Sequence, residues 1–354
     1  MKKTVLSIVV LLLAMSQSSA GLKKTPESSQ TAAHQKTDVI FIGYKTTVKV
    51  NANIAEVEKY ALNIQNMSIK TRGHTMDIHA PKPMEKLGDR ADFLERIYGV
   101  PYPGTFVLAY WKPGEEVWYL SLLGPEQISL LRLEVKPIPG GSRVTIKYEL
   151  QQAKTLKYRI SEVVNIQKVM AKLIDNEIVQ LQKHFDPSVK PEELLGKEKL
   201  GEFYNAFYQG EQISIQINAS KEKTEKYLTN PKTWQAWKDQ YGHDFGQCMS
   251  DGKPGQCPVS VRVLGQDIKA DSFAGTFKPG TYSSAYWVAK PVVVGIGASL
   301  KPKQGGTKLT VQYMISAPYE SASQQSDLMM TMLQVPQTIE QFLVSIKKDI
   351  EAGK

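Results

Sequence analysis

Apolar and polar positions follow the same order in the two halves of the chain. Three blocks of the first half return in the second: VKVNANIAEVEKYALN (48–63) as IQINASKEKTEKYLTN (215–230), PGTFVLAYW (103–111) as PGTYSSAYW (279–287), and LRLEVKPIPGGSRVTIKYEL (131–150) as IGASLKPKQGGTKLTVQYMI (296–315). Three matches in one order indicate a tandem duplication of one domain.

Each copy predicts the same series of elements. Residues 46–50 and 213–217 alternate in polarity with β-branched side chains, as strands do. A helix is then expected after Asn53 and after Ser220, because both are good N-cap residues and Glu56 completes a capping box with Asn53. Strand-like runs follow, and the last two flank a Gly-Gly turn as a hairpin.

A long amphipathic helix closes each copy. Its apolar residues recur at steps of three and four: Val163, Ile166, Met170, Leu173, Ile174, Ile178 and Leu181 in the first copy, and Leu328, Met332, Val335, Ile339, Phe342, Ile346 and Ile350 in the second. Pro336 predicts a kink in the second helix. The fold class is therefore α+β, with an antiparallel sheet covered on one face by a helix in each copy.

Length and composition agree with two globular domains. The chain has 354 residues, of which 42% are hydrophobic and 22% charged. We place the domains at 40–186 and 205–354, with a flexible segment at 21–39 and a linker at 187–204.

Residues 1–20 have the pattern of a secretory signal peptide. Lys2 and Lys3 precede an apolar run from Val5 to Met15 that is too short to span a membrane, and small residues up to Ala20 suit a peptidase. We expect cleavage near Ala20 and a periplasmic or secreted protein. Cleavage removes Lys2 and Lys3, which lowers the formal charge from +9 to +7. The remaining positive charge favours transient contact with an anionic membrane surface, and export argues against nucleic acid as a partner.

The chain has two cysteines, and both lie in the second copy. Cys248 and Cys257 flank a Gly/Pro-containing loop that has no counterpart in the first copy. In an exported protein this spacing predicts a structural disulfide, and two sulfurs without paired histidines make a poor zinc site.

Sequence motifs for catalysis are missing. The chain contains no HExxH, no GxSxG and no phosphate-binding Gly-rich loop, and its five histidines, at 34, 74, 79, 184 and 243, show no ligand spacing. We therefore predict no catalytic residue, no metal and no cofactor, and a protein that is not an enzyme.

The order of an opening strand, an N-capped helix (VKVNANIAEVEKYALN), a strand meander with a Gly-Gly hairpin (EVKPIPGGSRVTIKYEL) and a long closing helix resembles the START-like, or SRPBCC, helix-grip superfamily. The resemblance covers residues 40–186 and 205–352. It implies two tandem helix-grip domains, each a curved antiparallel sheet wrapped around a long C-terminal helix, with a hydrophobic cavity for lipids or other apolar ligands. Fold alone does not choose among the superfamily's functions.

Aromatic and methionine residues are our candidates for the lining of such a cavity, with core packing as the alternative for each. They are Tyr110, Trp111, Tyr148, Met170, Tyr286, Trp287, Tyr313, Met329 and Met332. In each Tyr-Trp pair one side chain alone can face inward, because strand neighbours alternate.

The leading hypothesis is an exported soluble protein that binds or transfers a hydrophobic small molecule or lipid, held between sheet and C-terminal helix. Two alternatives stay open. An aromatase/cyclase-type enzyme would need an ionisable or hydroxyl cluster that converges deep in one cavity, whereas an interaction scaffold would fill both cavities with its own side chains.

Overall fold

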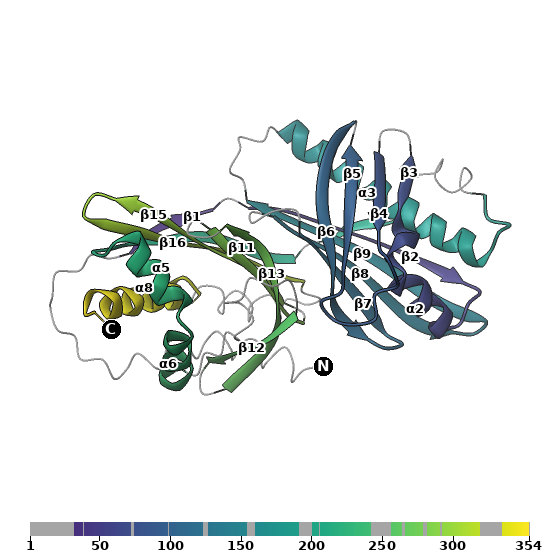
Figure 1. Cartoon of the computed structure of the whole chain (residues 1–354). Helices are drawn as coiled ribbons and strands as arrows, with labels where there is room; N and C mark the ends of the chain where they lie inside the picture. Colours follow the sequence, from purple (N-terminus) through teal and green to yellow (C-terminus); the bar gives the residue numbers. More distant parts are fainter. Residues whose placement is uncertain are drawn as a thin grey trace. The chain divides into compact units, whose positions relative to one another are not determined.

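The chain forms two compact units in a computed structural model (Figure 1). We call Ile40–Asn205 the first domain, and Ala206–Lys354 together with the residues up to Val39 the second domain. The structure describes residues 32–37, 39–71, 74–97, 99–122, 127–153, 160–190, 200–204, 206–241, 256–263, 266–278, 282–290, 292–318 and 335–353.

The first domain is built on a nine-stranded antiparallel sheet. In pairing order its strands are β10 (Glu202–Tyr204), β2 (Val39–Val50), β9 (Gly141–Ala153), β8 (Gln127–Ile138), β7 (Glu116–Leu122), β6 (Val100–Lys112), β5 (Arg90–Ile97), β4 (His74–His79) and β3 (Ile69–Thr71). Helix α2 (Ile54–Leu62), the 3-10 turn η2 (Ile64–Met67) and the long helix α3 (Ile160–Phe185) complete it.

The second domain repeats this plan with a seven-stranded sheet. Its strands pair in the order β1 (Ala33–Lys36), β11 (Ala206–Ile217), β16 (Gly306–Pro318), β15 (Val292–Lys303), β14 (Tyr282–Ala289), β13 (Gln266–Lys278) and β12 (Gln256–Val263). Its helices are α5 (Lys221–Thr229), α6 (Pro231–Tyr241) and α8 (Val335–Glu351). Both domains are thus α+β helix-grip folds, as predicted.

The helix after the opening strand starts at the expected cap in both domains. The amide of Glu56 donates to Asn53 Oδ1 at 3.0 Å, and Glu56 Oε2 accepts from the Asn53 amide at 2.8 Å. In the second domain the Lys223 amide donates to Ser220 Oγ at 3.2 Å. These bonds satisfy amides that the first helical turn otherwise leaves without acceptors.

The Gly-Gly hairpins are present and need glycine for two reasons. Gly140 and Gly141 have φ of 79° and 155°, and Gly305 and Gly306 have 80° and 152°. A Cβ at Gly141 would lie 2.1 Å from the carbonyl oxygen of Val50, the last residue of β2. The turn therefore fits directly against the end of the opening strand.

Each closing helix buries its apolar stripe on the concave face of its sheet. In the first domain, Ile174, Ile178 and Leu181 of α3 are at most 2% exposed and belong to one core cluster with strand residues such as Leu133 and Ile146. In the second, Leu343, Ile346 and Ile350 of α8 pack in the same way with residues of β11, β15 and β16.

The kink expected at Pro336 stays a prediction. The described part of the second closing helix begins at Val335, one residue before the proline. The part of the predicted helix from Leu328 to Gln334 lies outside the described residues.

Each sheet ends in a short strand that precedes the other repeat in sequence. Strand β1 comes before the first repeat but pairs with β11, with Ala33 opposite Ser214 and Lys36 opposite Glu211. Strand β10 comes before the second repeat but pairs with β2. Segments that we had assigned to a flexible stretch (21–39) and a linker (187–204) thus supply edge strands, because the open edges of β2 and β11 offer unpaired backbone groups.

The helices in the described part of the chain were also compared with the length and apolarity that a membrane span requires. None of them meets both requirements.

We predict that alanine at Gly141 destabilises the protein far more than alanine at Gly140. Gly140→Ala costs about 1 kcal/mol, since a Cβ there has only its positive φ to oppose it. Gly141→Ala adds a backbone clash and costs about 3 kcal/mol. Urea unfolding of both variants measures the difference, and equal losses would contradict this account of the turn.

Candidate functional site

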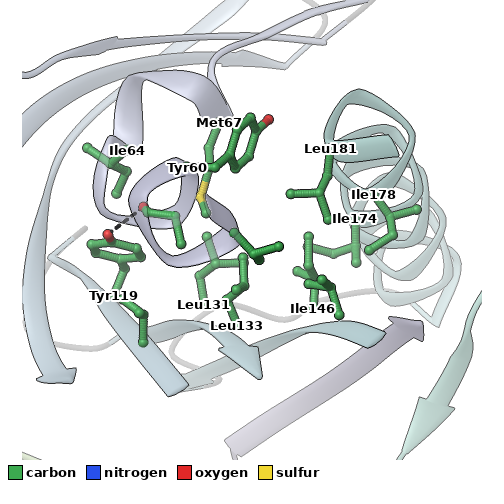
Figure 2. Close-up of a cluster of buried hydrophobic side chains, with 14 of the residues drawn as sticks. Tyr60, Ile64, Met67, Tyr119, Leu131, Leu133, Ile146, Ile174, Ile178 and Leu181 are labelled. Carbon is green, nitrogen blue, oxygen red and sulfur yellow. Dashed lines mark hydrogen bonds between the residues drawn. The ribbon is translucent and has the colours of Figure 1, made fainter. Parts of the chain in front are cut away.

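The concave side of the first domain holds a continuous apolar interior. Figure 2 shows Ile174, Ile178 and Leu181 of α3 facing Ile146 and Leu133 across it. Residues of α2 and η2 close the interior from another side (Figure 2), and Ile64 and Met67 are at most 2% exposed. The side chains of this interior pack against one another as a hydrophobic core.

Polar groups at its margin are bonded to the backbone. Tyr119 on β7 is fully buried and donates from its hydroxyl to the Ala61 carbonyl oxygen at 2.7 Å (Figure 2). The Tyr60 hydroxyl of α2 donates to the Asn66 carbonyl oxygen at 3.3 Å. The first bond attaches α2 to the sheet and the second joins α2 to η2, and neither hydroxyl is left without an acceptor.

Glu177 departs from that pattern. It lies on α3 next to Ile178, is 4% exposed, and its Oε1 has no hydrogen-bond partner among the described residues. Burial raises the pKa of the Glu177 carboxyl well above its usual range. Burial, and secondly the charge of Glu177, raises the pKa of Tyr60, so the carboxyl and the phenol influence each other.

The sequence contained a signal for Glu177 that we did not use. The carboxyl stands between Ile174, Ile178 and Leu181 on the stripe that we assigned to the core. A carboxylate inside such a stripe is costly to bury unless it is neutral or paired, so its position alone marks it as a candidate.

The two Tyr-Trp pairs point the same way in both domains. Trp111 packs against the first core and donates from Nε1 to Glu58 Oε1 of α2 at 2.5 Å, whereas Tyr110 packs on Trp118 with ring centroids 5.0 Å apart. In the second domain Trp287 stands opposite Val294 of the core cluster, so it shares the helix-facing side. In each pair the tryptophan, and not the tyrosine, faces the helix.

Tyr148 and Met170 are brought together. Met170 of α3 is 6% exposed and forms a small cluster with Ile42 and Leu150, against which Tyr148 packs. The Tyr148 hydroxyl is hydrogen bonded to Ser129 Oγ. Through this cluster, helix α3 packs at Met170 against strands β2 and β9.

The remaining candidates are spread differently. Tyr313 is buried in the second domain, where its hydroxyl donates to Glu211 Oε2 at 3.2 Å and accepts from Gln209 Nε2 at 3.1 Å. Tyr286, at 2% exposed, lies opposite Phe273 and Gly295, away from the helix-facing side. Two candidate methionines, Met329 and Met332, lie outside the described residues.

The predicted disulfide stays a prediction. Cys248 lies outside the described residues, and Cys257 is placed as part of β12, opposite Ser272. The predicted signal peptide likewise lies outside the described part of the chain.

A surface hollow of about 470 Å³ lies away from both apolar interiors. It is formed by Asn218–Glu222 at the start of α5, and by Pro302 and the Gly305–Gly306 turn. Among the described residues no three His, Cys, Asp or Glu side chains converge as a metal site would require.

No family model matches the sequence, and no curated protein matches it. Similar solved structures include the di-domain ARO/CYC BexL from the BE-7585A biosynthetic pathway, at 11% identity over 88% of this chain and 97% of that chain, with a TM-score of 0.32. The di-domain ARO/CYC StfQ from the steffimycin biosynthetic pathway matches at 9% identity over 87% and 98%, with a TM-score of 0.34. Protein CV1439 from Chromobacterium violaceum matches at 11% identity over 42% and 99%, with a TM-score of 0.33.

Our prediction that the protein is not an enzyme is contradicted by these matches, because ARO/CYC proteins stand among them. The missing sequence motifs were a weak basis for that prediction, since a buried carboxyl such as Glu177 needs no motif. At this identity and these TM-scores, the matches assign no activity to this chain.

We predict that Glu177→Gln stabilises the protein increasingly as pH rises. The folded state holds the Glu177 proton more tightly than the unfolded chain does, so the wild type loses stability as pH rises above about 4.5 and up to the raised pKa. The gap between variant and wild type should therefore widen by up to about 1.4 kcal/mol per pH unit.

Urea unfolding between pH 5 and 8 measures this gap. Lys172→Gln is the control, because Lys172 is exposed on the same helix and its replacement should leave the slope against pH unchanged. A gap that does not vary with pH would show that Glu177 is ionised in the folded protein.

Proposed function

We propose that the first domain binds a hydrophobic small molecule on its concave side and acts on it as an aromatase/cyclase-type enzyme, with Glu177 as proton donor. The observation that carries the proposal is the carboxyl of Glu177, buried on α3 in an apolar interior with no partner for Oε1. The enzyme alternative drawn from the sequence requires an ionisable or hydroxyl cluster deep in one cavity, and Glu177 with the nearby Tyr60 phenol is our candidate for it.

Burial gives Glu177 the property that an acid catalyst needs. A carboxyl with an ordinary pKa is ionised at neutral pH and has no proton to give. Burial raises the pKa of Glu177 and so favours the protonated form, and catalytic carboxyls are commonly tuned upward in this way. The neutral acid also avoids the cost of a buried unpaired charge.

The proposed reaction is the dehydration of a cyclic β-hydroxyketone. Glu177 gives its proton to the substrate hydroxyl, the C–O bond breaks and water leaves. The resulting carboxylate takes a proton from the carbon between the hydroxyl-bearing carbon and the ketone, and the C=C bond forms. Glu177 is then protonated again, so one carboxyl completes the cycle without an added oxidant, reductant or cofactor.

The surrounding residues supply binding. Each Å² of apolar ligand surface shielded from water contributes roughly 25 cal/mol. The Tyr60 phenol near Glu177 offers a polar contact. Export, as residues 1–20 predict, would place the enzyme outside the cytoplasm, where a basic surface favours membranes as the source of an apolar substrate.

The test uses 3-hydroxy-1-tetralone, whose dehydration gives fluorescent 1-naphthol. The full-length protein should accelerate naphthol formation, and Glu177→Gln should lower the rate about 100-fold or more. Lys172→Gln is the control, since Lys172 lies on the same helix and is exposed. It should keep the rate of the wild type.

Binding is measured separately by titrating the wild type and both variants with 1-naphthol. Binding together with a Glu177-dependent rate supports the proposal. Equal rates in the wild type and Glu177→Gln would overturn the role of Glu177, and loss of naphthol binding in every protein would overturn the binding of an apolar ring on the concave side.

A further inference from the structure

Strand β1 meets two other elements of the second domain. It pairs with β11 at the edge of the sheet, and the Thr37 amide extends the pairing by donating to the Gly210 carbonyl oxygen at 3.0 Å. From this edge the side chain of His34 reaches both β11 and the closing helix α8.

Each ring nitrogen of His34 contacts a carboxylate. Nδ1 lies 2.8 Å from Glu211 Oε1 on β11, and Nε2 lies 3.2 Å from Glu340 Oε2 on α8. A neutral imidazole carries one N–H and can donate one such bond only. Two donated bonds require the protonated ring, so the link from β1 to α8 depends on the charge of His34.

Other polar groups lie near His34. Glu211 is 5% exposed and also accepts from the Tyr313 hydroxyl on β16. Lys36 of β1 stands opposite Glu211 in the strand pairing, and its positive charge opposes protonation of His34. Burial lowers the pKa of His34, but hydrogen bonds and charges from Glu211 and Glu340 outweigh it and raise the pKa above 6.5.

The first domain builds the same joint without a histidine. Counting back without a gap from the aligned opening strands, Tyr44 corresponds to Glu211 and Gly201 to His34. The Tyr44 hydroxyl donates to Asp175 Oδ1 of α3 at 2.8 Å and accepts from the Gly201 amide at 2.9 Å. The Leu200 amide donates to Asp175 Oδ2 at 3.3 Å.

We propose that β1 is a pH-sensitive strap of the second domain, which ties α8 to the sheet while His34 is protonated and loosens in mildly alkaline solution. The equivalent strap of the first domain, made by Leu200 and Gly201, is held by amide and phenol donors that keep their protons at neutral pH. One of the two domains can therefore relax its closing helix while the other stays closed.

The direction with pH follows from proton binding. His34 binds its proton more tightly when β1 is linked to α8 than when this link is broken. The linked state is therefore favoured at low pH, and it loses its advantage as pH rises through the folded-state pKa of His34. On release of the proton, one ring nitrogen faces a carboxylate with its lone pair, and Glu211 stays buried beside an uncharged ring.

Hydrogen exchange of the full-length protein at pH 6.0 and 8.5, corrected for intrinsic exchange rates, tests the strap. Protection of the peptides that cover β1 and α8 should fall about threefold or more at the higher pH. The fall should stay below about tenfold, because the His34 side chain is 33% exposed and solvent weakens its ion pairs. In a Glu177→Gln background, where the first domain no longer carries the buried carboxyl that makes its stability depend on pH, protection at Leu200 and Gly201 should not change, which makes the first domain an internal control.

Two variants decide the cause. His34→Gln retains one donor and has no charge to lose, so the difference in protection between the two pH values should vanish. Glu340→Gln removes the charge on α8 and should shift the loss of protection to lower pH. Protection of β1 that is independent of pH in the wild type, or a wild-type pH response in His34→Gln, would overturn the proposal.

Discussion

The structure depends on covering one apolar face of each sheet with a single long helix. Without α3, the side chains of Leu133 and Ile146 would face water, and a core residue of this size contributes about 1.5–3 kcal/mol when buried. The N-capped helix and the Gly-Gly hairpin both serve this arrangement. The N-cap starts α2 directly after the opening strand β2. The Gly-Gly turn lets the hairpin of β8 and β9 approach the end of β2, so that the concave face closes.

An interior built in this way tolerates polar groups only under strict conditions. Tyr119 and Tyr44 are fully buried, and the hydroxyl of each has a partner. Glu177 is also buried, but its Oε1 has no hydrogen-bond partner among the described residues. Its presence therefore opposes the stability of the folded protein at neutral pH. A buried, unpaired carboxyl destabilises a core, and proteins retain such destabilising groups mainly at catalytic sites. Glu177 is therefore a reasonable candidate for catalysis.

The two copies have diverged at matching positions. The joint between opening strand, closing helix and exchanged edge strand uses Tyr44 with Asp175 in the first domain, and Glu211 with Glu340 in the second. The first is completed by backbone amides, whereas the second is completed by the imidazole of His34. Both copies keep the connection, and the change of side chains gave one copy a histidine whose pKa is raised by the carboxylates of Glu211 and Glu340.

Local patterns in the sequence determined much of this protein. The caps at Asn53 and Ser220, the Gly-Gly turns and the amphipathic closing helices could be predicted, because each depends on residues close together in the chain. The exchange of edge strands could not be, since β1 and β11 are paired by backbone groups that every residue carries. Nor could the isolation of Glu177 or the double contact of His34, because burial and ion pairing depend on which distant side chains approach. The periodicity of the sequence thus determined the helices and strands and which of their faces are buried. Tertiary structure alone determined which polar side chains are shielded from water, because that depends on residues far apart in the chain.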